Sequence, residues 1–183
     1  FVTKSDNIKH LLEINPHNQA IMSFSLNADE VARKWERGAP SVDRRIEAGA
    51  KLSQAGYEVR IRIDPIVPVP DWEKHYKNLV NQLLDSFTPS RITLGSLRGL
   101  QSTINGSTDK SWLQYLNENS NWGKKVDFKT RYEMYATIMG IINLEKGLFE
   151  PSPIRESAIS PVLSISGVVT SARNLLVCNS IFV

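Results

Sequence analysis

The stretch Tyr57-Glu58-Val59-Arg60-Ile61-Arg62-Ile63 decides the fold of this 183-residue chain. Apolar and charged residues alternate along it, and a period of two is typical of a β-strand with one apolar and one polar face. We expect Asp64-Pro65 to end the strand, because proline has no N–H to donate to a sheet. Asp71 should cap the helix that follows. The apolar stripe of that helix consists of Tyr76, Leu79, Val80, Leu83, Leu84 and Phe87.

Strands and helices also alternate upstream of this unit. The pattern predicts the end of a strand at 1–3, a helix over 8–12, a strand over 19–25 and helices over 28–35 and 41–55. Ser5 or Asp6 is expected to cap the first of these helices, and Ser41 the last. Phe1-Val2-Thr3 has the character of a strand already under way, so we expect an N-terminal part of the protein to precede it.

Downstream, a strand over 91–94 is expected to run into the polar segment 95–98, and a helix is expected near 110–118. Thr130 and Glu133 form a capping-box pattern ahead of an apolar helix that carries Met134, Ile138 and Ile142. We assign residues 1–143 to one α/β unit. Residues 144–183 are left unassigned as a C-terminal tail, in which Leu175-Leu176-Val177-Cys178 is either a short strand or part of a non-native stretch.

Strands separated by helices favour parallel pairing, because helical crossovers join successive parallel strands. The sequence therefore predicts an α/β fold, as a partial (β/α) barrel or a doubly wound sheet. In both architectures the chemistry gathers where the carboxyl ends of the strands meet, an edge that we call the mouth. All four predicted strands end in polar segments there, at 3–5, 25–27, 62–65 and 95–98.

The composition narrows the classes of function. The formal charge of +3, from 22 basic and 19 acidic residues, is too small to establish a nucleic-acid-binding protein. The single thiol, Cys178, excludes an internal disulfide and any metal centre held by several cysteines of this chain, and it fits a reducing cytoplasm. No segment approaches the roughly 20 apolar residues of a membrane span. The three histidines lack ligand spacing, so we predict no metal site within the chain.

Three polar residues near the ends of the first two strands are candidate ligand contacts. Lys4 follows the first strand and can pair with a carboxylate or phosphate, although a solvated loop lysine is the plainer interpretation. Ser25 and Asn27 end the next strand, where they can form hydrogen bonds to a polar ligand or act as ordinary helix caps. The residue types alone leave both roles open.

Charged residues mark the third and fourth strands. Arg60 and Arg62 share one face, and buried charges of this kind must either pair or face a ligand. Both explanations stay open at this point. Asp64 is the best single carboxylate of the mouth, because the following proline favours an extended backbone. Arg98 can bind a phosphate or carboxylate through two hydrogen bonds from its planar guanidinium, or it can be an ordinary surface arginine. For the paired explanation the candidate partners are Glu36, Asp64 and Glu47.

Taken together, several segments resemble the spore photoproduct lyase family of radical S-adenosylmethionine (SAM) enzymes. The resemblance covers roughly the first 140 residues, and order and spacing both fit. The segments that carry it are Thr3-Lys4-Ser5-Asp6-Asn7, Ser23-Phe24-Ser25-Leu26-Asn27, Glu36-Arg37-Gly38-Ala39-Pro40-Ser41 with Arg45-Ile46, Gly56-Tyr57, Arg62-Ile63-Asp64-Pro65-Ile66-Val67-Pro68 and Leu94-Gly95-Ser96-Leu97-Arg98.

The resemblance implies a partial (β/α) barrel in which a 4Fe-4S cluster, held by a Cys-x-x-x-Cys-x-x-Cys loop, binds SAM and yields a 5′-deoxyadenosyl radical. It implies DNA containing a cross-linked thymine dimer as substrate, an electron donor as partner, and a monomeric cytoplasmic enzyme. Lys4 and Ser25 would hold the amino-acid end of SAM, with Asn27 beside them. Arg62, Asp64 and Arg98 would line the mouth on the substrate side.

The chain departs from the family pattern in two respects. The cluster loop of the family precedes the matching segments, so the cluster ligands should lie outside this chain and these 183 residues alone should be inactive. From about Leu144 the sequence diverges from the expected next barrel strand. Two alternatives remain: a radical SAM enzyme with another substrate, or a non-catalytic α/β module that binds nucleic acid through Arg60, Arg62, Arg98 and Lys124-Lys125.

Overall fold

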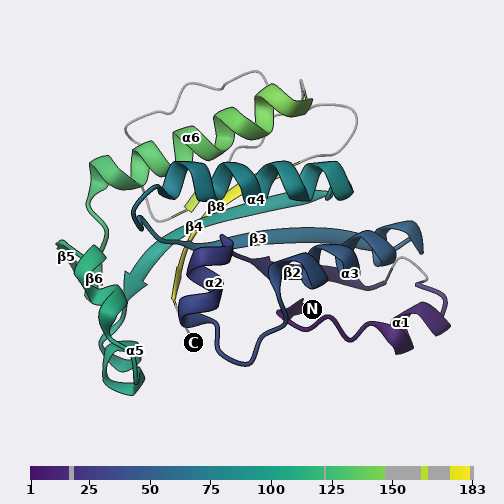
Figure 1. Cartoon of the computed structure of the whole chain (residues 1–183), viewed down its shortest axis with the longest axis horizontal. Coiled ribbons are helices and arrows are strands. Elements are labelled where there is room, and N and C mark those ends of the chain that lie inside the picture. The colour runs from purple at the N-terminus through teal and green to yellow at the C-terminus, as the bar shows by residue number, and fades with distance from the viewer. Residues whose placement is uncertain (17–18, 122, 147–161, 165–173, 182–183) are drawn as a thin grey trace.

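The computed structural model describes residues 1–16, 19–121, 123–146, 162–164 and 174–181. A mixed β-sheet forms its centre (Figure 1). Four parallel strands lie side by side in chain order: β1 (Val2–Thr3), β2 (Ile21–Leu26), β3 (Glu58–Ile66) and β4 (Arg91–Gly99). The predicted α/β fold with parallel pairing is thereby confirmed, and the carboxyl ends of β1 to β4 meet at one edge of the sheet.

Four further strands extend the sheet beyond β4. β5 (Glu118–Ser120) and β6 (Gly123–Lys125) form an antiparallel hairpin, and β6 pairs with the carboxyl end of β4 at Arg98 and Gly99. β8 (Asn174–Ile181) runs parallel to β4, and β7 (Val162–Ser164) pairs antiparallel with β8. The alternative of a short strand over 175–178 is thus confirmed, as part of a longer one.

The longer helices pack as a row, α3 (Val42–Gln54) against α4 (Trp72–Ser86) and α4 against α6 (Phe128–Lys146). Figure 1 shows α4 and α6 running side by side over the sheet. Shorter elements follow the carboxyl ends of strands: α1 (Lys9–Glu13), α2 (Asp29–Trp35), α5 (Gln101–Gly106) and a 3-10 helix, η1 (Ser111–Tyr115). Among the described helices, none combines the length and hydropathy that crossing a bilayer requires.

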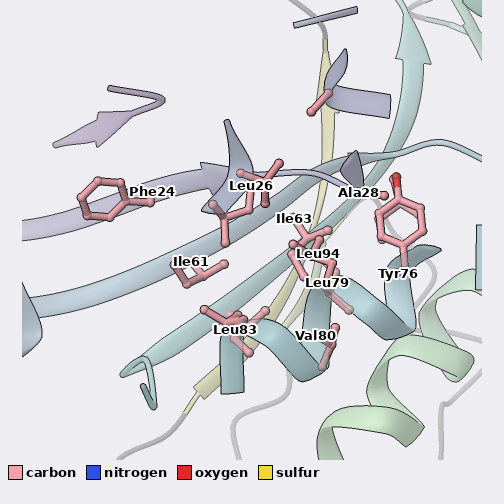
Figure 2. Packing of buried hydrophobic residues seen from close by; sticks show 14 of the residues in the cluster. Phe24, Leu26, Ala28, Ile61, Ile63, Tyr76, Leu79, Val80, Leu83 and Leu94 are labelled. Carbon is pink, nitrogen blue, oxygen red and sulfur yellow. The ribbon is translucent and has the colours of Figure 1, made fainter. Parts of the chain in front are cut away.

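The core lies between the sheet and the helix row. Ile61 and Ile63, on the apolar face of β3, are fully buried against Leu79 and Leu83 of α4 (Figure 2). The alternating pattern and the helical stripe therefore meet as predicted. Figure 2 also shows Phe24, Leu26 and Leu94 from the neighbouring strands in the same layer.

The predicted strand end at Asp64-Pro65 was wrong, and Asp71 takes the predicted N-cap position of α4 without a side-chain hydrogen bond. β3 continues through Asp64-Pro65 to Ile66, and its register against β4 shifts between Ile63 and Ile66. A proline is tolerated within a strand where the regular ladder is interrupted. Asp71 does not cap α4 with its side chain; it adopts a left-handed conformation with φ of 56°, and its backbone carbonyl accepts from the amide of His75 at 3.2 Å.

Helix caps were predicted with mixed success. Ser41 caps α3 as expected, since its side chain accepts a hydrogen bond from the Arg44 amide. Ser5 and Asp6 do not cap α1, which begins only at Lys9 and has no side-chain cap; Asp6 instead pairs with Arg44. A surface ion pair with α3 thus takes the place of the local cap.

The segment 100–130 differs most from expectation. A helix was predicted near 110–118, but the chain forms α5, η1 and the β5–β6 hairpin there. Thr130 and Glu133 do not form a capping box, because both lie inside α6. The capping residue is Asp127, whose carboxylate accepts from the backbone amide of Thr130 at 2.9 Å and from its hydroxyl at 2.8 Å. The predicted apolar face of α6 is buried at Met134, Ile138 and Ile142.

Candidate functional site

The mouth brings four of the candidate residues to one edge of the sheet. Lys4 directly follows β1, Ser25 lies in β2, Asp64 in β3 and Arg98 in β4. Parallel pairing makes this convergence unavoidable, and Ser25 lies opposite Arg62 in the β2–β3 register. The four strand ends that were expected to carry polar groups therefore face a common region.

Lys4 and Ser25 are joined by a chain of contacts that the sequence did not reveal. The Nζ of Lys4 lies 3.3 Å from Oε1 of Glu36, and the other carboxylate oxygen of Glu36 lies 2.8 Å from Nη2 of Arg45. Nη1 of Arg45 donates to the backbone carbonyl of Ser25 at 2.8 Å. The side chains of Glu36 and Arg45 are each 1% exposed, whereas that of Lys4 is 35% exposed. Of these three charged side chains, that of Lys4 is the one open to solvent.

Asn27 lies beneath the mouth and is fully buried. Its Nδ2 donates to the carbonyl of Pro65 at 2.9 Å, and its Oδ1 accepts from the Ala28 amide at 2.9 Å and from the Tyr76 hydroxyl at 2.7 Å. The Tyr76 oxygen in turn accepts from the Val67 amide at 2.8 Å. Burial raises the pKa of Tyr76, so the phenol stays neutral. Asn27 thus clamps β2 to β3 and α4, and its contact with SAM stays a prediction.

The charged face of β3 consists of ion pairs. Arg62 contacts Asp64 through Nη2 and Oδ2 at 2.9 Å, and Arg60 contacts Glu58 at 2.7 Å. The paired explanation is confirmed for both arginines, and Asp64 is the partner of Arg62. The two other suggested partners were wrong, because Glu36 pairs with Arg45 and Lys4, and Glu47 pairs with Lys51 at 2.6 Å.

Asp64 has a raised pKa even though it forms an ion pair with Arg62. Its side chain is 2% exposed. Burial raises its pKa, and the hydrogen bond and charge of Arg62, followed by the charge of Lys4, only partly oppose that increase. Arg62 keeps 31% of its side chain exposed, so the arginine of the pair reaches the surface of the mouth.

Arg98 lies in a basic group at the end of β4. It lies opposite Lys125 of β6 in the sheet register. Arg131, at the start of α6, contacts Glu118 at 3.7 Å, and Lys125 contacts the same carboxylate at 2.8 Å. Burial, followed by the charge of Arg131, lowers the pKa of Arg98. Arg131 and Tyr135 were not predicted as site residues, because only the apolar positions of this helix stood out in the sequence.

A cavity of about 620 Å³ opens beside Lys4. Its walls come from two segments far apart in sequence, 34–39 around the end of α2 and 102–112 around α5 and η1. The walls are connected where Nε1 of Trp35 donates to the Ser111 hydroxyl at 3.1 Å. This volume is typical of small-molecule sites. Lys4 and Glu36 line it, whereas Ser25, Asp64 and Arg98 are not among its lining residues. No metal-binding group of three His, Cys, Asp or Glu side chains occurs within the described ranges.

Comparison with known families explains this geometry. The model of the family described as "Spore photoproduct lyase" matches residues 1–95, which is just over half of the chain. This chain belongs to the spore photoproduct lyase family. The matched segment contains β1 to β3 complete and ends within β4. It therefore includes Lys4, Ser25, Glu36, Arg45 and Asp64, but not Arg98.

Curated spore photoproduct lyases align with the same half. The enzyme of Bacillus subtilis (strain 168) is 37% identical over 92 residues, and that of a Geobacillus species is 34% identical over 83 residues. These alignments cover 50% and 45% of this chain but 27% and 24% of the relatives. The chain thus aligns with about a quarter of the length of these spore photoproduct lyases.

Solved structures extend the likeness beyond the matched segment. Spore photoproduct lyase complexed with dinucleoside spore photoproduct superposes with a TM-score of 0.64 at 21% identity, covering 79% of this chain and 47% of that chain. A mutant with bound AdoMet and dinucleoside spore photoproduct superposes with a TM-score of 0.65, the same identity and the same coverage. The α/β fold with its mixed sheet therefore matches part of spore photoproduct lyase.

Proposed function

We propose that this chain forms the SAM-facing wall of a radical SAM lyase that repairs UV-induced thymine dimers in DNA. In this proposal β1 to β4 belong to a partial (β/α) barrel over residues 1–143, and the parent enzyme is a cytoplasmic monomer. The observation that carries the proposal is Lys4, a partly exposed cation that borders a ligand-sized cavity at the carboxyl ends of the strands. Family membership supplies the reaction class.

The residues of the mouth fit the amino-acid end of SAM. Glu36 is already compensated by buried Arg45, so Lys4 keeps an effective positive charge that a carboxylate can neutralise. Ser25 lies at the end of the adjacent strand, and its hydroxyl can donate to the same group. We assign Lys4 and Ser25 to direct contact with SAM. Asn27 holds the strand ends on which these contacts depend.

The residues present do not fit an iron-sulfur cluster. The chain has one cysteine, Cys178, and a 4Fe-4S cluster needs several thiolates. We therefore assign the cluster ligands to cysteines outside these 183 residues. When bound, the cluster and SAM would supply radical chemistry, with an external electron donor, to a substrate at the mouth.

The substrate side of the mouth carries the remaining candidates. Arg62 is a partly exposed arginine paired with buried Asp64, and Arg98 stands beside Arg131 and Lys125. Positive groups in this position suit the phosphates that flank a DNA lesion. Pairing with Asp64 does not prevent Arg62 from contacting a ligand. About one-third of the arginine side chain is exposed, so it can still contact a phosphate.

The test is anaerobic reconstitution of the intact protein that contains this chain. We expect iron binding, cleavage of SAM under reduction, and repair of DNA that carries the photoproduct. Lys4→Met should weaken SAM binding about tenfold or more, the loss expected for a charge-assisted hydrogen bond. Failure to bind iron or to cleave SAM would contradict the proposal. Cleavage of SAM without repair would instead indicate another substrate.

A second candidate function rests on the basic group of Arg98, Arg131 and Lys125. If the protein is a non-catalytic nucleic-acid-binding module, its affinity for undamaged DNA should fall steeply with salt and show no dependence on SAM. Glu118 is the carboxylate that contacts Arg131 and Lys125 in the described part of the chain. A flat salt response in a DNA titration eliminates this module.

A further inference from the structure

We infer that Arg45 and Glu36 are positioning residues that set how the protein recognises the carboxylate of SAM. The inference rests on the proposed function, in which Lys4 and Ser25 contact that carboxylate. Neither Arg45 nor Glu36 touches the ligand in this proposal. Both act by fixing the placement and the charge of the two residues that do.

The contacts form one continuous path across the mouth. Arg45 donates a hydrogen bond to the Ser25 carbonyl at 2.8 Å and forms an ion pair with Glu36 at 2.8 Å, and Glu36 lies 3.3 Å from Lys4. The path joins four separate segments, since Lys4 follows β1, Ser25 lies in β2, Glu36 is the C-terminal cap of α2 and Arg45 lies in the first turns of α3. One guanidinium therefore links the two contact residues, in addition to the pairing of β1 with β2.

Burial argues that this pair serves more than stability. Both side chains are 1% exposed. Removing two charges from water costs about as much as their attraction returns, so a buried ion pair is weak evidence for stabilisation and an apolar pair of the same volume often does as well. What an apolar pair cannot do is hold a lysine ammonium on one side and a backbone carbonyl on the other.

The charges explain why Arg45 matters for Lys4. With Arg45 present, the negative charge of Glu36 is compensated within the protein, and the ammonium of Lys4 is available to an anion. Without Arg45, Glu36 would have Lys4 as its nearest cation in the described structure, and the lysine would be neutralised by its own protein. Arg45 thus keeps the contact residue charged toward the cavity that Lys4 and Glu36 line.

The experiment compares two ligands that differ only at this carboxylate. Binding of SAM and of decarboxylated SAM is measured by calorimetry on the intact, anaerobically purified protein. The wild type should prefer SAM by about tenfold or more, the worth of one charge-assisted hydrogen bond. Arg45→Met should reduce that preference to less than about threefold and leave the affinity for decarboxylated SAM within about twofold. A general loss of folding would lower both affinities together.

A double variant keeps the test decisive if Arg45→Met does not fold. Glu36→Gln combined with Arg45→Met leaves no unpaired buried charge and no carboxylate at residue 36 that could neutralise Lys4, so this variant tests the placement of Lys4 and Ser25 alone. It should fold and still lose the preference, because the contacts that hold both residues are gone. The matched control is Glu47→Gln combined with Lys51→Met, which removes an exposed ion pair from the same helix. Thermal melting of each variant reports its folding separately from ligand choice.

The outcomes separate this inference from the proposed function. If the wild type shows no preference for SAM, or Lys4→Met retains it, the proposed SAM site is wrong and the roles of Arg45 and Glu36 fall with it. If Lys4→Met loses the preference while the folded double variant retains it, the site stands and this inference is overturned.

Discussion

The backbone amide of Ser96 in β4 donates a hydrogen bond to the hydroxyl of Tyr135 on α6, at 2.9 Å. Ser96 is fully buried, and burial raises the pKa of Tyr135, so this hydroxyl stays neutral at pH 7. Tyr135 lies one turn after Arg131 on α6, and Ser96 lies two residues before Arg98 on β4. The bond therefore fixes the helix that brings the second arginine to the mouth.

We expect Tyr135→Phe to lower the free energy of unfolding by about 1–3 kcal/mol, because the buried Ser96 amide loses its acceptor. Urea denaturation measures the change. Tyr132→Phe is the matched control, since Tyr132 is 45% exposed and its substitution should be nearly neutral. Equal effects of the two substitutions would contradict the assigned role.

The raised pKa of Asp64 makes a prediction about pH. A carboxyl group whose pKa is raised on folding favours the protonated form, so its contribution to stability is largest at low pH and falls as the pH rises through the folded pKa. Asp64→Asn should therefore gain stability relative to the wild type between about pH 4 and about pH 7. Urea midpoints at the two pH values measure it. A change in the opposite direction would show that the Arg62 pair outweighs burial.

Asp127 should behave in the opposite way. Hydrogen bonds from the Thr130 amide, from Asn117 and from the Thr130 hydroxyl lower its pKa to about 2, from an ordinary value of 3.8. Its stabilisation is complete above about pH 4 and is lost as the pH falls toward about 2. Asp127→Ala should cost about 1 kcal/mol at neutral pH, as a lost helix cap does, and progressively less in acid. A constant cost across this range would be inconsistent with the carboxylate acting as the cap.

Gly123 permits the β5–β6 hairpin to pack on β4. Its φ is +123°, and a Cβ atom there would lie 2.2 Å from the carbonyl oxygen of Gly99. Gly123→Ala should therefore destabilise the protein by about 1–3 kcal/mol and increase hydrogen exchange in the hairpin first. Gly106→Ala is the control, because a Cβ atom at Gly106 meets nothing within 4 Å. If both substitutions were neutral, the hairpin would not depend on this close approach.

Much of the fold was predictable because its signals are local. The alternation over 57–63 and the apolar stripe of α4 each depend on one segment, and both are seen in the packing of Ile61 against Leu83. The cap at Ser41 is equally local. The extension of β3 to Ile66 escaped prediction, since the tolerance of a strand for proline depends on the register of its neighbour.

The two residues that we propose to contact SAM were chosen from the sequence, but the contacts that support them were not foreseen. Lys4 and Ser25 follow from their place at strand ends and from the family motifs. The link between them depends on Glu36 and Arg45, which are nine residues apart and come from two helices. Charged residues on amphipathic helices are usually solvated, so nothing in the sequence indicated that these two are buried together.

The bond between Trp35 and Ser111 has a practical consequence. The indole borders the cavity beside Lys4, packs edge-on against Tyr115 at a centroid distance of 6.2 Å, and joins a wall inside the family match to one outside it. Indole fluorescence responds to its hydrogen bonding and to nearby solvent. Trp35 can therefore serve as an intrinsic fluorescent probe. Quenching or a spectral shift of its emission on adding a ligand would show that the cavity is occupied, without any added label.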